Sequence, residues 1–195
     1  MSWKVGITGG IGSGKSTLCR LFQARGVAVY DTDAAAKRLM VEQPALREAI
    51  IRQFGAESYL EDTLNRSYLA QRVFSDPKQR VQLNSLVHPA VIADFEQWAE
   101  AQTGEYVILE SAILFEAGLD KHVDRTVAVL APERLRIERT MQRDKTSEEQ
   151  VRSRMAAQAD DDTLRARADI SVVNIFEEEL ESIVQELDFR FKNRM

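Results

Sequence analysis

The stretch Gly-Gly-Ile-Gly-Ser-Gly-Lys-Ser at residues 9–16 decides the fold of this chain. It satisfies the full pattern G-x-x-x-x-G-K-[ST], and the short apolar run at residues 5–7 supplies the preceding strand that this motif requires. Glycines let the backbone turn its N–H groups inward toward phosphate oxygens, and the start of the following helix adds partial positive charge. The stretch therefore predicts a triphosphate-binding loop, or P-loop, between a strand and a helix.

Residues within this loop have distinct expected roles. Lys15 is expected to reach the β- and γ-phosphates, and the Ser16 hydroxyl is expected to coordinate Mg²⁺. A glycine-rich turn that serves packing alone would explain the glycines but not the adjacent Lys-Ser pair. The other residues expected to bind the nucleotide are Gly10, Ile11, Gly12, Ser13, Gly14 and Thr17.

The composition is that of an ordinary globular protein. The 195 residues are 29% charged and 44% hydrophobic with a net charge of −5, so we expect one core with smaller appendages and no nucleic-acid surface. A single cysteine, Cys19, excludes an internal disulfide and a multi-cysteine zinc site, and it is expected to be buried. No apolar run approaches the ~18 residues of a membrane span. We expect a soluble cytoplasmic protein, and a monomer rather than a stable oligomer.

Apolar runs separated by helical patterns predict a parallel α/β sheet. Such runs are typical of strands that are buried on both faces by flanking helices. Together they indicate a P-loop NTPase core with a five-stranded parallel sheet. The predicted strands are residues 5–7, 27–30, 106–109, 126–130 and 168–173.

Residues 34–102 read as helical throughout, with no convincing strand. This segment is longer than a simple crossover between two strands needs, so it is interpreted as an inserted substrate-binding region. Helix breaks are predicted at Pro44, residues 55–63, residues 76–77 and His88-Pro89.

Two side chains of the insertion are candidates for contact with an acceptor. His88 precedes Pro89, which favours the first turn of a helix, and a hydrogen bond at that helix start is its simplest role. Arg66 is most simply a solvated surface charge, although a guanidinium could also bind an anionic acceptor.

Carboxylates follow two of the predicted strands. Asp31 and Asp33 come directly after residues 27–30, at the sheet edge where such proteins bind ligands. One aspartate suffices to cap the next helix, so we favour Asp33 as the base that accepts the proton of an attacking hydroxyl, with Asp31 as a residue that could share or replace this role. Glu110 ends another strand and is either an acid that assists Mg²⁺ or an ordinary strand-end glutamate.

Arginines gather on two helices after the fourth predicted strand. Arg139 and Arg143 are four residues apart and share a face, residues 144–146 break the helix, and a second helix with Arg154 is expected to run to Gln158. A solvated charged face would explain this pattern. It also fits a mobile lid that closes over the nucleotide and brings cations to the transferred phosphoryl group.

A phosphate loop alone leaves several classes of protein open. A switch-type GTPase would need N-K-x-D and D-x-x-G motifs, and the sequence contains neither. A small-molecule kinase remains as the best interpretation. Its predicted parts are a nucleotide-binding core at residues 1–33, 103–132 and 159–195, a helical acceptor-binding region at 34–102 and a helical lid at 133–158.

The stretches that carry a resemblance to a known family are residues 8–17, Asp31-Thr32-Asp33, His88-Pro89, Leu114-Phe115-Glu116, Arg139, Arg143, Arg154, Gln158 and Asn174. In their order and spacing they resemble the dephospho-coenzyme A kinase family over nearly the whole chain. The sequence departs from the family pattern at Ala112, where proline is common, and at Glu110, where aspartate is frequent.

The resemblance implies transfer of the γ-phosphoryl group of ATP, with Mg²⁺, to the ribose 3′-hydroxyl of dephospho-coenzyme A. It implies that Asp33 activates this hydroxyl, that Arg139 stabilises phosphate and that Arg143 lies near the nucleotide. The acceptor contacts that it implies are Thr8, Asp33, Arg66 and His88. Two other classes stay open: a nucleoside or nucleoside-monophosphate kinase, which shares the core and lid but reads a base, and a nucleotide-dependent regulatory module with no acceptor.

Overall fold

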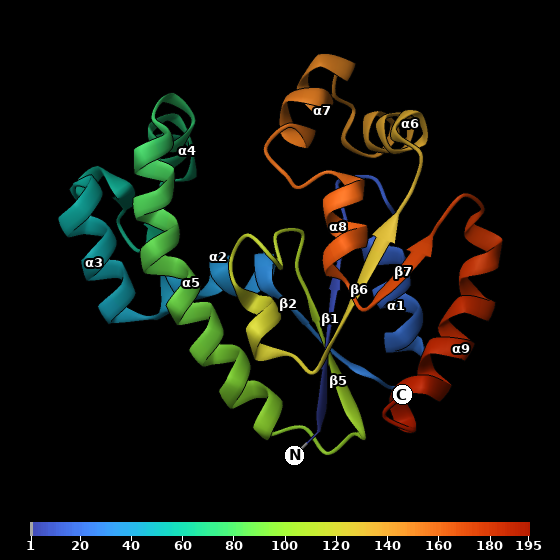
Figure 1. Cartoon of the computed structure of the whole chain (residues 1–195). Coiled ribbons are helices and arrows are strands. Elements are labelled where there is room, and N and C mark those ends of the chain that lie inside the picture. Colours follow the sequence, from blue (N-terminus) through green and yellow to red (C-terminus); the bar gives the residue numbers. More distant parts are fainter. Residues whose placement is uncertain (1) are drawn as a thin grey trace. The chain divides into compact units, whose positions relative to one another are not determined.

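A computed structural model describes residues 2–195 of the chain (Figure 1). Its main sheet has five strands in the order β2-β5-β1-β6-β7, and every neighbouring pair is parallel. The predicted five-stranded parallel sheet is therefore confirmed. The strands are β1 (Trp3–Thr8), β2 (Ala28–Asp31), β5 (Tyr106–Glu110), β6 (Arg125–Leu130) and β7 (Ile170–Val173).

Strand β1 lies at the centre of this sheet, between β5 and β6. Ile7 near its end is in register with Glu110 of β5, and Asp31 of β2 is in register with the same glutamate. Because all strands point the same way, their carboxyl ends form one edge, and the loop that follows β1 starts at the middle of that edge.

Helices α1 (Lys15–Ala24) and α9 (Leu180–Lys192) cover one face of the sheet. Their apolar stripes meet the alternate side chains of the strands. Phe191 of α9 packs against Phe22 of α1 and Tyr106 of β5, with ring centroids 6.1 Å and 5.4 Å apart. On the other face, a Cβ added to Gly6 would lie 2.9 Å from the Leu114 side chain, which shows how closely the segment after β5 packs there.

The chain from β6 to β7 forms three helices, which belong to the same compact unit as the sheet. They are α6 (Glu133–Asp144), α7 (Glu148–Met155) and α8 (Asp161–Arg167). The predicted break at 144–146 is present, with Lys145 in the left-handed region at φ 51°. Helix α7 ends at Met155, short of the predicted Gln158, and α8 was not predicted.

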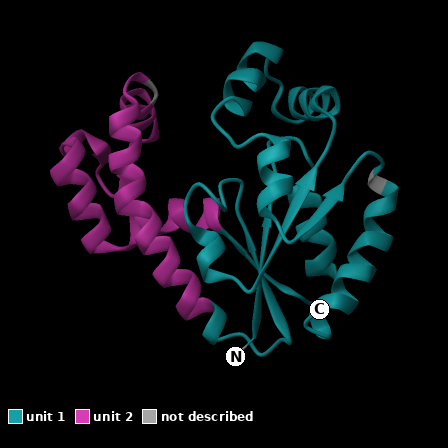
Figure 2. Cartoon of the chain, viewed as in Figure 1, with its two compact units in different colours: residues 1–31, 99–195 teal, residues 32–98 magenta. Residues whose placement is uncertain are grey.

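Residues 32–98 form a second compact unit (Figure 2). It contains α2 (Thr32–Glu42), α3 (Pro44–Phe54), α4 (Arg66–Ser75) and most of α5 (Pro77–Glu100). The prediction that no strand occurs here was wrong, because β3 (Tyr59–Leu60) and β4 (Thr63–Leu64) pair as a small antiparallel hairpin. Two-residue strands are too short to produce a visible alternation of apolar and polar residues.

The predicted break at His88-Pro89 was also wrong, because Pro89 lies inside the continuous helix α5. A proline in a helix removes one backbone hydrogen bond and costs about 3 kcal/mol. The helix continues because residues on both sides of the proline share one buried stripe at four-residue spacing. The stripe consists of Val87, Val91, Phe95 and Ala99. Within residues 2–195, no helix is both long enough and apolar enough to span a membrane.

Candidate active site

The P-loop connects the end of β1 to the start of α1 through glycines that no other residue could replace. Gly12 and Gly14 have φ values of 77° and 94°, in the left-handed region. A Cβ on Gly12 would lie 2.2 Å from the Arg136 carbonyl oxygen, and one on Gly14 would lie 2.0 Å from Asn174 Nδ2. The glycines therefore serve both the turn and the close approach of α6 and of the segment after β7.

Lys15 and Ser16 converge on a single carboxylate at the end of β5. Lys15 Nζ lies 2.5 Å from Glu110 Oε1, and Ser16 Oγ donates to the same oxygen at 2.7 Å. Burial acts to raise the pKa of Glu110, but the charge of Lys15 and the hydrogen bonds from Lys15, Ser16 and Cys19 outweigh it. The pKa of Glu110 is therefore lowered, and this carboxylate stays ionised at neutral pH.

Cys19 is 1% exposed, as expected for a packing residue of α1. Burial, together with the nearby charge of Glu110, raises the pKa of its thiol well above the usual value. The thiol is therefore protonated and inert at neutral pH.

Asp33 lies in the first turn of α2, two residues after the end of β2. The helix begins at Thr32, earlier than expected, so Asp31 rather than Asp33 occupies the position before the first turn. Both aspartates are solvent-exposed. Asp31 therefore occupies the position from which an aspartate can cap a helix, a role that the sequence left open for either residue.

The arginines expected in a lid fall into two groups. Arg143 and Arg154 both bind Asp144: Arg143 Nε and Arg154 Nη1 each lie 2.7 Å from a carboxylate oxygen of this aspartate. Arg139 instead donates to the backbone carbonyls of Asn174 and Ile175, each at 3.2 Å. Hydrogen bonds from Arg143 and then from Arg154 hold the pKa of Asp144 well below its usual range.

The remaining candidates are Thr8, Arg66 and His88. Thr8, at the end of β1, is fully buried, and Arg66 is the exposed first residue of α4. His88 is half-buried in α5, where burial lowers the pKa of its imidazole. Arg66 and His88 belong to the unit at 32–98, whereas Thr8 belongs to the unit with the sheet.

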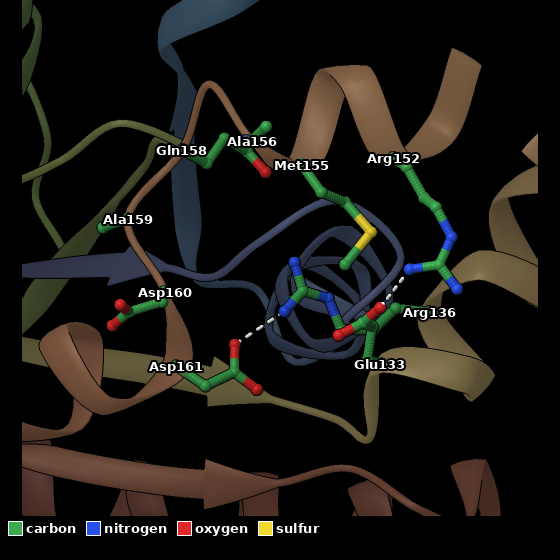
Figure 3. A pocket seen from close by; sticks show the side chains of 9 residues that line it. All are labelled: Glu133, Arg136, Arg152, Met155, Ala156, Gln158, Ala159, Asp160 and Asp161. Atoms are coloured by element: carbon green, nitrogen blue, oxygen red, sulfur yellow. Dashed lines mark hydrogen bonds and ion pairs between the residues drawn. The ribbon is translucent and has the colours of Figure 1, made fainter. Parts of the chain in front are cut away.

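A cavity of about 490 Å³ lies between α6, α7 and the loop before α8 (Figure 3). Two ion pairs line it, Arg136 with Asp161 at 2.6 Å and Arg152 with Glu133 at 2.5 Å. The lining residues are Glu133, Arg136, Arg152, Met155, Ala156, Gln158, Ala159, Asp160 and Asp161.

Sequence reasoning missed Arg136 and Asp161. Arg136 is 5% exposed and lies on the buried face of α6 with Ile137 and Thr140. An arginine on the apolar face of an amphipathic helix was the one available signal, because a charge placed there needs a partner inside the protein. Its partner, Asp161, lies on a helix that the sequence pattern had not revealed.

Oxygen ligands for a metal are present at the P-loop. Ser16 Oγ and Glu110 Oε1 are the hard ligands that Mg²⁺ prefers. No group of three or more His, Cys, Asp or Glu side chains that could hold a metal occurs in the described part of the chain, residues 2–195.

A family model for dephospho-CoA kinase matches residues 3–179. A dephospho-CoA kinase of Salinibacter ruber is 49% identical over 169 residues, which is 85% of each chain. The crystal structure of TT1252 from Thermus thermophilus is 34% identical, covers 96% of both chains and has a TM-score of 0.86. A dephospho-CoA kinase from Campylobacter jejuni, 23% identical with full coverage and a TM-score of 0.74, has the same fold. The chain belongs to the dephospho-CoA kinase family.

Proposed function

We propose that this chain transfers the γ-phosphoryl group of ATP to the ribose 3′-hydroxyl of dephospho-CoA, forming CoA and ADP. The observation that carries the proposal is the convergence of Lys15 and Ser16 on Glu110 at the middle of the sheet edge, in a member of this family. This arrangement provides a cation and metal-binding oxygens directly beside the glycine-rich loop, as phosphoryl transfer requires.

The donor half of the reaction is assigned to the P-loop. Lys15 and the other loop residues from Gly10 to Thr17 hold the β- and γ-phosphates and neutralise the charge that develops on them. Mg²⁺, held by Ser16 and assisted by Glu110, supplies further charge neutralisation when it is bound with ATP. Phosphoryl transfer needs little covalent chemistry, so positioning by these groups contributes most of the rate.

The acceptor half is assigned to Asp33 and to the region at residues 34–102. Asp33 accepts the proton of the 3′-hydroxyl as its oxygen attacks, and Thr8, Arg66 and His88 contact the acceptor. The exposure of the Asp33 carboxylate, close after the carboxyl end of β2, supports this role. Asp31 is the alternative base.

The segment 133–158 is proposed as the lid. Arg143 and Arg154, now bound to Asp144, would exchange this partner for phosphate oxygens, which guanidinium groups bind in the same geometry. Arg139 stabilises phosphate from the same segment. In the structure it donates hydrogen bonds to the carbonyl oxygens of Asn174 and Ile175.

The decisive experiment measures ADP release from Mg–ATP with dephospho-CoA, with nucleosides, with nucleoside monophosphates and with no acceptor. Stimulation by dephospho-CoA alone supports the proposal. Stimulation by a nucleoside or its monophosphate would replace it with the related kinase class, and equal release in every arm would indicate a module without an acceptor. Omission of Mg²⁺ should abolish the stimulated rate.

Cellular location and assembly complete the proposal. We infer a cytoplasmic monomer that binds ATP and dephospho-CoA, with no nucleic-acid or membrane partner, from the modest net charge and the composition. Light scattering of the purified chain measures the assembly state directly, and a mass near 22.1 kDa is expected.

A further inference from the structure

Ile11 of the P-loop forms hydrogen bonds through both its N–H and its carbonyl oxygen to side chains that are distant in the sequence. The Ile11 N–H donates to Gln158 Oε1 at 2.8 Å. The Ile11 carbonyl oxygen accepts from Arg136 Nε at 3.0 Å. Both partners come from the 133–161 part of the chain, so this segment contacts the loop that is proposed to hold the phosphates.

Arg136 is itself locked in place. Its side chain is buried, and Nη1 forms an ion pair with Asp161 at 2.6 Å. A Cβ on Gly10 would lie only 2.0 Å from Arg136 Nη2, so the guanidinium packs directly on the loop backbone. A buried guanidinium has little freedom to leave its carboxylate partner, because it would then be buried without a counter-charge.

Gln158 is held from two directions. Its own N–H donates to the Met155 carbonyl at the end of α7, at 3.0 Å. The next residue, Ala159, donates its N–H to Glu116 Oε1 at 2.9 Å. Gln158 is therefore fixed between α7 and the segment after β5, and its amide oxygen stays where the Ile11 N–H needs an acceptor.

A glycine-rich loop gains flexibility at the expense of order. The backbone N–H groups that bind phosphate must converge before the nucleotide arrives if they are to bind it without a large loss of conformational entropy. Glycines do not enforce such convergence, because they allow many backbone conformations. Side chains that bind the loop from outside can impose it.

We propose that Arg136 and Gln158 are positioning residues for the P-loop: together they hold the backbone of Ile11 so that the phosphates of ATP meet a preformed cradle. This inference deepens the proposed function and rests on it only for the identity of the nucleotide. The two side chains couple the 133–161 segment to the loop through one residue.

The first test compares Gln158→Met, which keeps the side-chain length and removes the acceptor, with Gln185→Met on an exposed position of α9 as the control. Calorimetry measures the Kd for Mg–ATP without any acceptor substrate. We expect Gln158→Met to raise this Kd by about five- to tenfold, as for one lost hydrogen bond, and Gln185→Met to leave it unchanged. The KM for dephospho-CoA should change less than twofold in both variants.

Equal rises in the Kd for ATP and the KM for the acceptor would overturn the proposal, and so would a lowered Tm with unchanged ATP affinity. Amide hydrogen exchange adds a direct readout, because the Ile11 N–H should lose protection in Gln158→Met and keep it in Gln185→Met. Calorimetry and exchange need no acceptor, so both remain decisive even if dephospho-CoA fails as a substrate.

The second test asks whether the two side chains act through the same residue. Arg136→Lys retains a cation for Asp161 but cannot also supply the Nε donor to Ile11. We expect this variant to raise the Kd for ATP about threefold to tenfold, and the double variant with Gln158→Met to weaken binding by less than the product of the two single effects. A double variant whose effect equals that product would show two independent contributions, and it would contradict a shared role of the two side chains in holding Ile11.

Discussion

The ion pair between Lys15 and Glu110 beside the P-loop differs in burial from the ion pairs that Arg143 and Arg154 form with Asp144. Lys15 and Glu110 expose 14% and 11% of their side chains, whereas Arg143 and Arg154 expose 59% and 50%. A pair shielded from water is costly to break, but exposed pairs contribute about 0–1 kcal/mol and exchange partners readily. The donor cradle, which consists of the P-loop with Lys15 and Glu110, is therefore held in a fixed structure. Arg143 and Arg154, in contrast, can exchange Asp144 for another anion.

The largest effect is expected when the buried ion pair between Lys15 and Glu110 is broken. Lys15→Ala removes the cation beside the phosphates and leaves Glu110 without its charged partner, so we expect kcat/KM for ATP to fall by about 10³-fold. Steady-state ADP release checks this value. A fall of less than tenfold would mean that an exposed arginine, not Lys15, neutralises the γ-phosphate.

Asp33→Asn should leave the donor cradle intact and remove only the proton acceptor. We expect turnover to fall by about 10²- to 10³-fold while the Kd for Mg–ATP stays within twofold. Calorimetry and ADP release separate the two quantities. Asp31→Asn is the matched variant, and a larger loss in that variant would move the base from Asp33 to Asp31.

The lowered pKa of Glu110 gives the buried pair a pH signature. A carboxyl whose pKa is depressed on folding contributes stability above its unfolded pKa, and this contribution is lost as pH falls through its folded pKa. Glu110→Gln should therefore lower the free energy of unfolding by about 1–3 kcal/mol at pH 7 and by much less under acidic conditions. Denaturant titrations of both proteins at pH 7 and pH 3 measure this difference, and a penalty that does not change with pH would contradict it.

The smallest effect is expected when the exposed ion pairs of Arg143 and Arg154 with Asp144 are broken. Asp144→Asn removes the carboxylate that competes with phosphates for Arg143 and Arg154, so ATP should bind about twofold more tightly at low salt, with the gain lost in high salt. Glu181→Gln, which breaks the exposed pair with Arg25, is the matched control and should change nothing. Weaker ATP binding in Asp144→Asn would show that Asp144 orients the arginines instead of competing for them.

Local patterns predicted the P-loop and the five parallel strands of the sheet. The P-loop could be identified because its residues are consecutive, and each strand of the sheet contains a short apolar run. Pro89 misled because the cost of a proline is local, whereas the burial that compensates for it extends from Val87 to Ala99. The roles of all the candidate site residues stay predictions, on the donor side as well as on the acceptor side.

These local patterns could not predict contacts between segments that are distant in the sequence. Arg136 and Ile11 are separated by 125 positions in the sequence, and Arg136 and Asp161 by 25. No spacing rule connects such residues, because the path of the chain through the sheet decides which of them meet. Gln158 and Asn174 were noticed only through a family resemblance, which gave neither of them a partner. The structure supplies those partners, Ile11 and Ser13.

The bond between Asn174 and the P-loop has a consequence for biosynthesis. Asn174 Nδ2 donates to the Ser13 carbonyl at 2.8 Å across 161 positions of sequence. Ser13 is synthesised 161 residues before Asn174, so this contact can form only after β7 has been synthesised. Long-range contacts of this kind form late and slow the acquisition of the native state. Nascent chains that stop before residue 174 would contain the entire phosphate-binding motif and still lack this bond, so we expect tight ATP binding only from chains that extend through Asn174.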